Sequence, residues 1–333
     1  MAITMKATLY PWLQETWQRT QKDKDRMPHA LLLSGAYGLG KYRFASLLAQ
    51  SILCNETDQY GFACGRCKNC QLFAAQSHPD FQLISPEEKG KAIIVDQIRA
   101  WINTVTLRPH IAAMKATVIH PADAMNHNAA NCLLKMLEEP PLGNVLILVG
   151  HQPERLPTTV RSRCRWIKLP IPNRQMALEW LQKTLPSGSG QAEILLQQAH
   201  GAPLYAQQLH EDEFMQHRDL LLGDLEDIAR QQKSPVVCAD HWQKIGALRS
   251  IRWFQGLLAD MVKFTTTGDS AWLVNPDMAT RLHALSKGLH LKELFQLSEK
   301  IAETGKLLNT PLDERLLLED SLICWLRLYR NQR

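Results

Sequence analysis

Short apolar runs alternate with amphipathic stretches along the first half of the chain. Apolar residues repeat at helical spacing in 96–105 and 128–138, and Pro140-Pro141 ends the second of these stretches. The intervening runs are short, aliphatic and typical of buried strands: 30–34, 81–85, 116–120, 145–150 and 165–169. Because strands and helices alternate, we expect an α/β fold whose largely parallel sheet is flanked by helices.

The pattern changes after the last of these strands. A proline-containing hinge at 170–172 precedes sequence in which helical periodicity dominates. A loop at 186–190 and a break at 201–203 divide the next stretch into three helical segments, and Pro203 suits a first helical turn. Longer helices are predicted at 242–265, 291–308 and 312–329. We therefore predict three domains: an α/β domain at 1–170, a small helical lid at 171–212 and an all-α domain at 213–333.

Composition places the chain among soluble globular proteins. It has 333 residues, of which 45% are hydrophobic, enough for two or three cores. No run of about 18 apolar residues occurs, and the first residues lack the basic-then-apolar order of a secretory signal, so we expect a cytoplasmic protein. The net charge of +5 comes without the dense basic tract of an autonomous DNA-binding protein.

Half of the eight cysteines cluster in the pattern Cys54-x9-Cys64-x2-Cys67-x2-Cys70. Such a cluster indicates a metal site, whereas disulfide frameworks belong mainly to short secreted chains. Four thiolates without an open position are typical of structural zinc. We predict a zinc module at 54–70 that staples an insertion to the core. Free or buried cysteines are one alternative, and a zinc-dependent nucleic-acid binder is another, which the missing basic tract disfavours.

A phosphate-loop motif follows the first predicted strand. Residues 35–42 read Gly-Ala-Tyr-Gly-Leu-Gly-Lys-Tyr, which matches G-x-x-x-x-G-K but lacks the Ser or Thr that should come next. That hydroxyl ligates magnesium in a working loop, and the Tyr42 hydroxyl lies a ring's length too far out. Gly35, Gly40 and Lys41 are therefore candidates for weak nucleotide binding at most. A Gly-rich turn with an exposed lysine is the alternative.

A second defect lies at the end of the strand at 116–120. ATP hydrolysis needs an acidic pair at such a position, to hold magnesium and to orient water. Here the strand ends in His120-Pro121, and the nearest carboxylate, Asp123, is displaced by three residues. These two independent defects predict that the chain does not hydrolyse ATP.

Three arginines alternate in the turn Arg161-Ser162-Arg163-Cys164-Arg165, just before the strand at 165–169. One interpretation is an arginine finger, a guanidinium that reaches the nucleotide site of an adjoining subunit and stabilises charge on the transferring phosphate. The other is a solvated basic turn, which is common on protein surfaces. Spacing alone leaves both open.

Taken together, these residues resemble the clamp-loader branch of the AAA+ ATPases, and within it the bacterial gamma/tau and delta-prime proteins. The matching stretches follow the family's order between residues 28 and 165: Pro28-His29-Ala30-Leu31-Leu32, the four cysteines, Ser77-His78-Pro79-Asp80, Val95-Asp96-Gln97-Ile98-Arg99, 131–141 and Ser162-Arg163-Cys164. The set is highly specific, although no single stretch is decisive.

The resemblance implies an AAA+ module that carries zinc, a small lid and a helical collar. It implies assembly with gamma/tau and delta subunits in a hetero-pentamer that loads the sliding clamp onto primed DNA for the DNA polymerase III holoenzyme. In that setting Arg163 would be a finger acting in trans on a neighbouring gamma/tau ATP site, and the chain would have no independent catalysis.

Three departures from the motor proteins favour the delta-prime type. They are Tyr42 at the magnesium hydroxyl, His120-Pro121 at the acidic pair and Leu204 at the place of the lid arginine. The alternative is an active ATP-hydrolysing motor of the gamma/tau type. Because Lys41 is retained, residual nucleotide binding stays open at this point.

Overall fold

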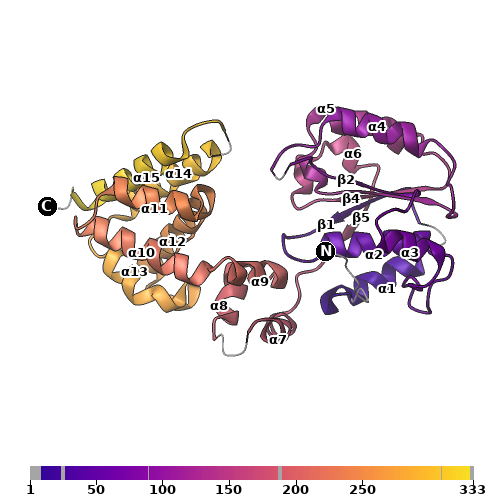
Figure 1. The fold of residues 1–333 in the computed structure, drawn as a ribbon. Helices are drawn as coiled ribbons and strands as arrows, with labels where there is room; N and C mark the ends of the chain where they lie inside the picture. The colour runs from indigo at the N-terminus through magenta and orange to yellow at the C-terminus, as the bar shows by residue number, and fades with distance from the viewer. Residues whose placement is uncertain (1–8, 24–26, 89, 187–189, 309, 331–333) are drawn as a thin grey trace. The chain divides into compact units, whose positions relative to one another are not determined.

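The computed structural model describes residues 9–23, 27–88, 90–186, 190–308 and 310–330 (Figure 1). The chain forms two compact units. The first comprises residues up to 183 together with 201–205, and the second comprises 184–200 together with 206–333. Each unit has its own core and is described by itself. In the described part of the chain, no helix combines the length and the apolarity that a membrane crossing requires.

A five-stranded parallel sheet forms the centre of the first unit, as the sequence predicts. Its strands lie in the order β2-β3-β4-β1-β5, with β1 paired to β4 on one side and to β5 on the other. Their bounds lie within a residue or two of the expected runs: β1 Ala30–Ser34, β2 Phe81–Ile84, β3 Lys115–Ile119, β4 Asn144–Val149 and β5 Arg165–Lys168. Because β1 lies between β4 and β5, the loop that follows it opens between these two strands at the sheet's carboxyl edge.

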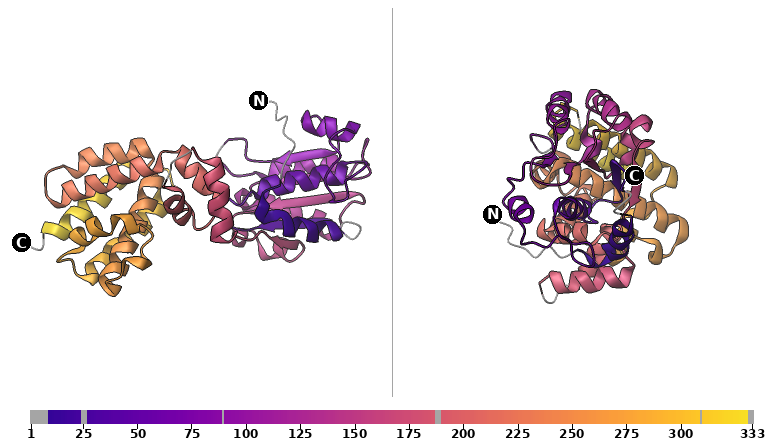
Figure 2. Two further views of the ribbon diagram at one scale, coloured as in Figure 1. Left: turned by 90° about the horizontal axis from the view of Figure 1, so that it is seen from below. Right: turned by 90° about the vertical axis from the view of Figure 1, so that its right-hand side faces the viewer.

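Helices cover both faces of this sheet (Figures 1 and 2). Side chains alternate along each strand, so Leu31 and Leu33 enter one apolar layer whereas Leu32 enters the other. The first layer contains Trp17 and Phe44 from the helices α1 and α2, and the second is closed by α4 and α5. The helices of this unit are α1 Gln14–Lys22, α2 Lys41–Leu53, α3 Lys68–Ala74, α4 Val95–Val105, α5 His127–Glu138, α6 Thr158–Arg161 and α7 Arg174–Thr184.

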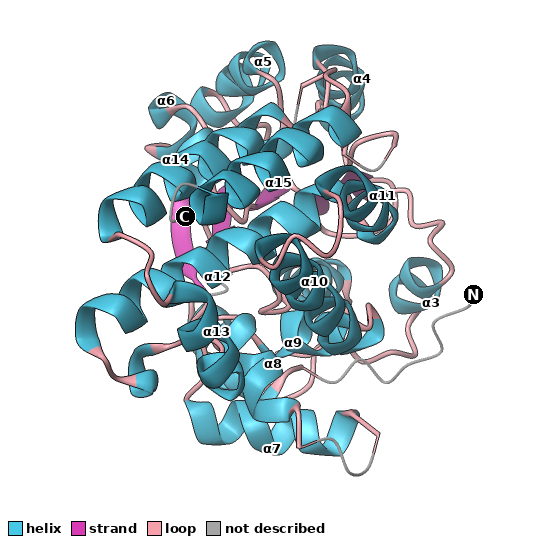
Figure 3. Cartoon of the chain, turned by 90° about the vertical axis from the view of Figure 1, so that its left-hand side faces the viewer, coloured by secondary structure: helices cyan, strands magenta, loops and turns pink. Residues whose placement is uncertain are grey.

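The second unit is helical throughout its described residues (Figure 3). Its core stacks Trp242, Phe254 and Trp325 edge to face, with ring centroids 5.4 and 5.7 Å apart. Trp325 donates its indole N–H to the carbonyl of Leu225, which fixes α15 against α10. The helices are α8 Ala192–Gln198, α9 Pro203–Glu211, which begins in the first unit, α10 Phe214–Ala229, α11 Pro235–Ile245, α12 Ala247–Thr267, α13 Ala279–Ser286, α14 Leu291–Leu307 and α15 Glu314–Arg330. Single 3-10 turns occur in the first unit at Pro11–Leu13, Ala122–Ala124 and Pro153–Arg155, and in the second unit at Ser270–Trp272 and Pro276–Met278.

One helix prediction was wrong. The stretch 242–265, expected as a single helix, is divided between α11 and α12 at Gly246, whose φ is 116°. Glycine adopts this backbone conformation readily, whereas an L side chain resists it. Apolar residues continue at helical spacing on both sides of Gly246, so the sequence pattern did not show the break. The helices expected at 291–308 and 312–329 are confirmed as α14 and α15, and Pro203 opens α9 as predicted.

Candidate functional site

The phosphate-loop motif has the strand-loop-helix setting that the sequence predicts. The loop leaves β1 at Ser34, and α2 begins at Lys41. Gly38 and Gly40 take left-handed backbone conformations, with φ of 79° and 85°, as a loop that curls its N–H groups inward requires. Gly35 and Gly40 thus lie at the two ends of one loop at the carboxyl edge of the sheet, and Lys41 follows it as the first residue of α2.

The loop lysine is bonded to its own loop. Lys41 is 2% exposed, and its Nζ donates to the carbonyls of Gly35 at 2.7 Å and Ala36 at 2.6 Å. Burial lowers the pKa of Lys41 to about 8, against the attraction of the Asp123 carboxylate, which raises it. These contacts rule out a Gly-rich turn with an exposed lysine. They also use donors that would otherwise meet a phosphate.

Tyr42 and His120, which the sequence analysis places at the two defects of the phosphate-loop site, stack on each other. Their ring centroids are 4.9 Å apart and their planes are inclined by 21°. The contact extends as a chain of rings: His120 meets His151 at 5.7 Å, His151 meets Tyr37 at 5.1 Å, and Tyr37 meets Tyr205 at 5.3 Å. Aromatic side chains therefore occupy the edge of the sheet where a nucleotide-bound metal would lie in a working site.

The histidines of this ring chain favour the neutral form. Burial lowers the pKa of His120, and it lowers the pKa of His151 to about 4, with the charge of Lys41 acting in the same direction. Asp123 accepts hydrogen bonds from the backbone N–H groups of His151 at 3.2 Å and Gln152 at 3.0 Å. The displaced carboxylate noted in the sequence thus anchors the segment after β4.

Residues from two other segments of the first unit pack against Gly38 and Gly40 of the phosphate loop. The N–H of Leu204, at the start of α9, donates to the carbonyl of Gly38 at 3.1 Å. A Cβ added at Gly38 would lie 2.5 Å from Tyr205, and one at Gly40 would lie 2.5 Å from the ring of Tyr10. Neither Tyr10 nor Tyr205 was picked out in the sequence, since neither belongs to the motif.

The four cysteines converge as predicted. Their Sγ atoms all lie within 4.8 Å of one another, and the closest pairs are 3.5 Å (Cys54 and Cys70) and 3.6 Å (Cys54 and Cys64) apart. Cys67 caps the N-terminus of α3 and Cys70 lies in its first turn. Asn69 binds the carbonyl of Leu53 through its side chain, which ties this helix to the end of α2. The cluster could hold a metal ion.

Backbone N–H groups point at the sulfurs of this cluster. The N–H of Cys64 lies 3.3 Å from the Cys54 sulfur, and the N–H of Cys67 lies 3.4 Å from the Cys64 sulfur. Such bonds from Arg66 and Cys67 lower the pKa of Cys64 to about 6, whereas burial raises the pKa of Cys54 and Cys70. Thiolate is the form that binds metal, and the N–H groups stabilise it.

Arg163 stands in the turn between α6 and β5. Its side chain is 38% exposed and forms an ion pair with Glu138 on α5, Nη2 to Oε1, at 2.8 Å. Nη1 donates to the carbonyl of Thr159 at 3.1 Å. Cys164, the next residue, is buried in the apolar layer under α5, so the turn is anchored while its arginine faces outward.

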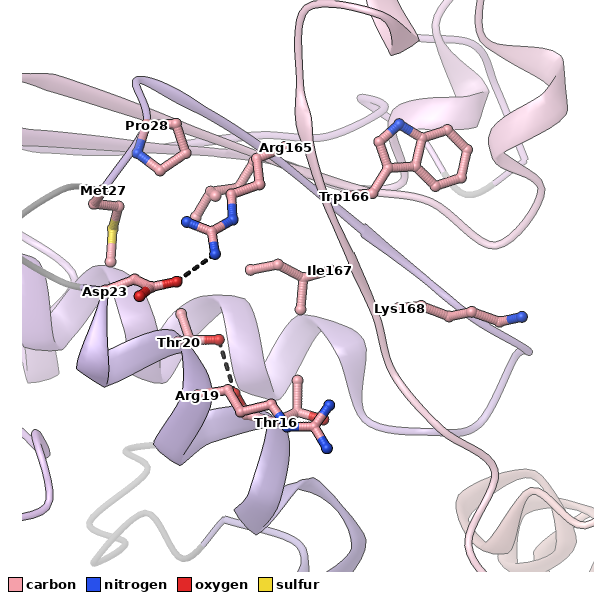
Figure 4. A pocket seen from close by; sticks show the side chains of 11 residues that line it. Thr16, Arg19, Thr20, Asp23, Met27, Pro28, Arg165, Trp166, Ile167 and Lys168 are labelled. Atoms are coloured by element: carbon pink, nitrogen blue, oxygen red, sulfur yellow. Dashed lines mark hydrogen bonds and ion pairs between the residues drawn. The ribbon is translucent and has the colours of Figure 1, made fainter.

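A cavity of about 210 Å³ lies beside this turn, between α1 and β5 (Figure 4). Its wall includes Met27, Pro28 and Ile167, and Arg165 points into it to form an ion pair with Asp23. This cavity was not predicted from the sequence, because its wall joins two segments that lie far apart in the chain. Of its charged wall residues, Arg165 and Asp23 are paired with each other and Arg19 is paired with Glu15 outside the wall.

Comparison with known proteins identifies the family of this chain. A family model described as "DNA polymerase III, delta subunit" matches residues 12–173, and one described as "DNA polymerase III, delta subunit, C terminal" matches 212–327. The DNA polymerase III subunit delta' of Pseudomonas aeruginosa is 36% identical over 322 residues, which cover 96% of this chain and 98% of that protein. This chain belongs to the DNA polymerase III delta' family.

Other delta' proteins match over similar lengths. That of Yersinia pestis is 29% identical and that of Escherichia coli K12 is 28% identical, each over about 95% of both chains. Among solved structures, a gamma subunit-related protein of Thermotoga maritima covers 96% of this chain at 19% identity, with a TM-score of 0.47. Membership of the delta' family confirms the resemblance read from the sequence motifs.

Proposed function

We propose that this chain is a non-hydrolysing subunit of the DNA polymerase III clamp loader. In this proposal it assembles in the cytoplasm with gamma/tau and delta subunits as a hetero-pentamer, which loads the sliding clamp onto primed DNA. The stacking of Tyr42 on His120 carries the proposal, because the two positions that should bind magnesium bind each other. Gly35, Gly40 and Lys41 would bind nucleotide weakly or not at all, since Lys41 is occupied by its own loop.

The chemistry of this subunit would act in trans through Arg163. Its guanidinium lies on an exposed turn, and a planar fork of N–H donors suits the oxygens of a transferring phosphate. The proposed role is an arginine finger that completes the ATP site of a neighbouring gamma/tau subunit. In this proposal the subunit hydrolyses no ATP at its own phosphate loop, where Lys41 is bonded to the loop carbonyls.

We propose structural zinc as the ion of the four-cysteine cluster. Four sulfurs at about 2.3 Å from a central zinc lie about 3.8 Å from one another in a tetrahedron. Four of the six sulfur pairs are separated by 3.5 to 4.0 Å, and all six lie within 4.8 Å, which fits. Bound zinc would cross-link the segment after α2 to α3 and supply no catalysis.

The division into an AAA+ module (1–170), a lid (171–212) and a collar (213–333) is part of the proposal. The two family models match on either side of the lid, over 12–173 and 212–327. The helices α10 to α15 form one core of their own, which suits an oligomerisation domain.

ATP turnover by the reconstituted complex tests the finger directly. We expect Arg163→Ala to leave assembly and metal content intact and to lower DNA-stimulated turnover. Arg155→Ala is the matched control, since it removes an exposed arginine from a nearby turn of the same domain. If both variants turn over ATP at the wild-type rate, Arg163 is not a finger.

A further inference from the structure

The guanidinium of Arg163 is held by groups from two different helices. Glu138, the last residue of α5, lies 2.8 Å from Nη2, and the carbonyl of Thr159 in α6 lies 3.1 Å from Nη1. The Ser162 hydroxyl lies 3.4 Å from the same Nη1. Both helices pack against the sheet in one apolar layer, which contains Leu137 and Val160. The side chain is therefore oriented by a rigid frame.

These contacts leave part of the donor fork unused. A guanidinium carries five N–H bonds. Both hydrogen bonds of Arg163, to the Thr159 carbonyl and the Ser162 hydroxyl, use Nη1, and Nη2 forms the ion pair with Glu138. Among the described residues, Nε has no acceptor, and the three contacts can use at most three of the five hydrogens. The remaining N–H donors can bond to phosphate oxygens.

We propose that Glu138 is a positioning residue, which orients Arg163 so that its unused donors meet the phosphate of the neighbouring subunit's nucleotide. The inference rests on the proposed finger role. A free arginine side chain loses much rotamer freedom when it becomes ordered at its target, and an ion pair that orders it beforehand removes part of that cost. Because the pair is partly exposed, it is weak enough to let the side chain adjust on assembly.

The neighbouring carboxylate provides a matched control. Glu139 is exposed and follows Glu138 directly, but no ion pair with it is found among the described residues. Glu138→Ala and Glu139→Ala therefore remove the same charge one residue apart. Glu138→Gln keeps an oxygen that can accept from Nη2, and it tests whether orientation or charge matters.

The experiment measures kcat and KM for ATP in the reconstituted, DNA-stimulated complex, with assembly checked for each variant. We expect Glu138→Ala to lower kcat at the site that the finger serves by about two- to fivefold, the range that an exposed ion pair supports. KM for ATP should stay unchanged, because the finger acts on the transition state. Glu138→Gln should recover part of the loss, Glu139→Ala should resemble wild type, and Arg163→Ala should lose more than Glu138→Ala.

The outcomes separate the inference from the function on which it rests. If Arg163→Ala lowers turnover but Glu138→Ala does not, Glu138 plays no positioning part although the finger stands. If Arg163→Ala has no effect, the finger and its positioning residue are both refuted. A loss with Glu138→Ala that persists in Arg163→Ala background would show that Glu138 acts by another route.

Discussion

The phenol ring of Tyr42 stacks on the imidazole of His120, with centroids 4.9 Å apart. Tyr42 follows the loop lysine at the start of α2, and His120 follows the end of β3. In the proposed function each residue takes the place of a different magnesium-binding group. The two departures noted in the sequence thus meet in one ring contact.

This stacking predicts coupling between the two positions. Tyr42→Ala and His120→Ala should each lower the free energy of unfolding, and the double variant should lose less than the sum. Contacts between such rings contribute about 0.5–1.5 kcal/mol beyond area burial, so the coupling should be of that order. Urea unfolding of the four proteins in the cycle measures it. Additive losses would mean that the rings do not stabilise each other.

Lys41 should contribute to stability without any nucleotide. Its Nζ donates two hydrogen bonds within the loop, so Lys41→Met leaves the carbonyls of Gly35 and Ala36 without that partner. We expect a loss of about 1–3 kcal/mol in the free energy of unfolding of the nucleotide-free protein. Lys306→Met, at an exposed position of α14, is the control and should change little. Equal stability of both variants with wild type would show that the buried lysine is dispensable.

Acid should destabilise the ring chain through His151. Burial holds its pKa near 4 in the folded state, below the usual 6.5, with Lys41, Asp123 and His120 as its charged or titratable neighbours. The unfolded chain therefore takes up a proton first, and stability that is present above pH 6.5 is lost as the pH falls towards 4.

The test compares urea unfolding at pH 7.5 and pH 5. Wild type should lose on the order of 1 kcal/mol more than His151→Phe between these two conditions, after allowance for solvent screening. His127→Phe removes an exposed histidine from the same unit and should keep the wild-type dependence. If His151→Phe has the same pH dependence as wild type, His151 is not the group that titrates.

Removal of the metal should weaken the first unit. Binding energy at a closed cysteine site is also folding energy, so a strong chelator should lower the melting temperature by several degrees. We expect one zinc per chain by elemental analysis and its loss in Cys70→Ser. Cys132→Ser, on α5 and outside the cluster, should keep zinc. A purified protein that lacks metal yet melts at the same temperature after chelation would contradict a structural zinc site.

The fold of the first unit was predicted well from the sequence, because strands and helices have different apolar periodicities and because residues such as Pro140-Pro141 mark where elements end. All five strands and the helices around 96–105 and 128–138 were located to within a residue or two. The break at Gly246 was missed because the helical spacing of apolar residues continues through it. Only the backbone conformation of this glycine shows that the helix ends there.

The site was predicted only as far as its motifs extend. The phosphate loop and the cysteine cluster were found because their residues are close together in the chain, at spacings that are typical of phosphate-binding and metal-binding motifs. Tyr10, His151 and Tyr205 were missed because they reach the loop from distant segments. The pairing of Glu138 with Arg163 was missed for the same reason, since 25 positions separate them and only the packing of α5 on α6 brings them together.

Steady-state ATP hydrolysis by the purified chain, alone and with magnesium in excess, tests the central claim most directly. The proposed function predicts no turnover above background, in the wild type and in Lys41→Met alike. A clear rate in the wild type that Lys41→Met abolishes would contradict it, because the chain would then hold magnesium and ATP in its own site.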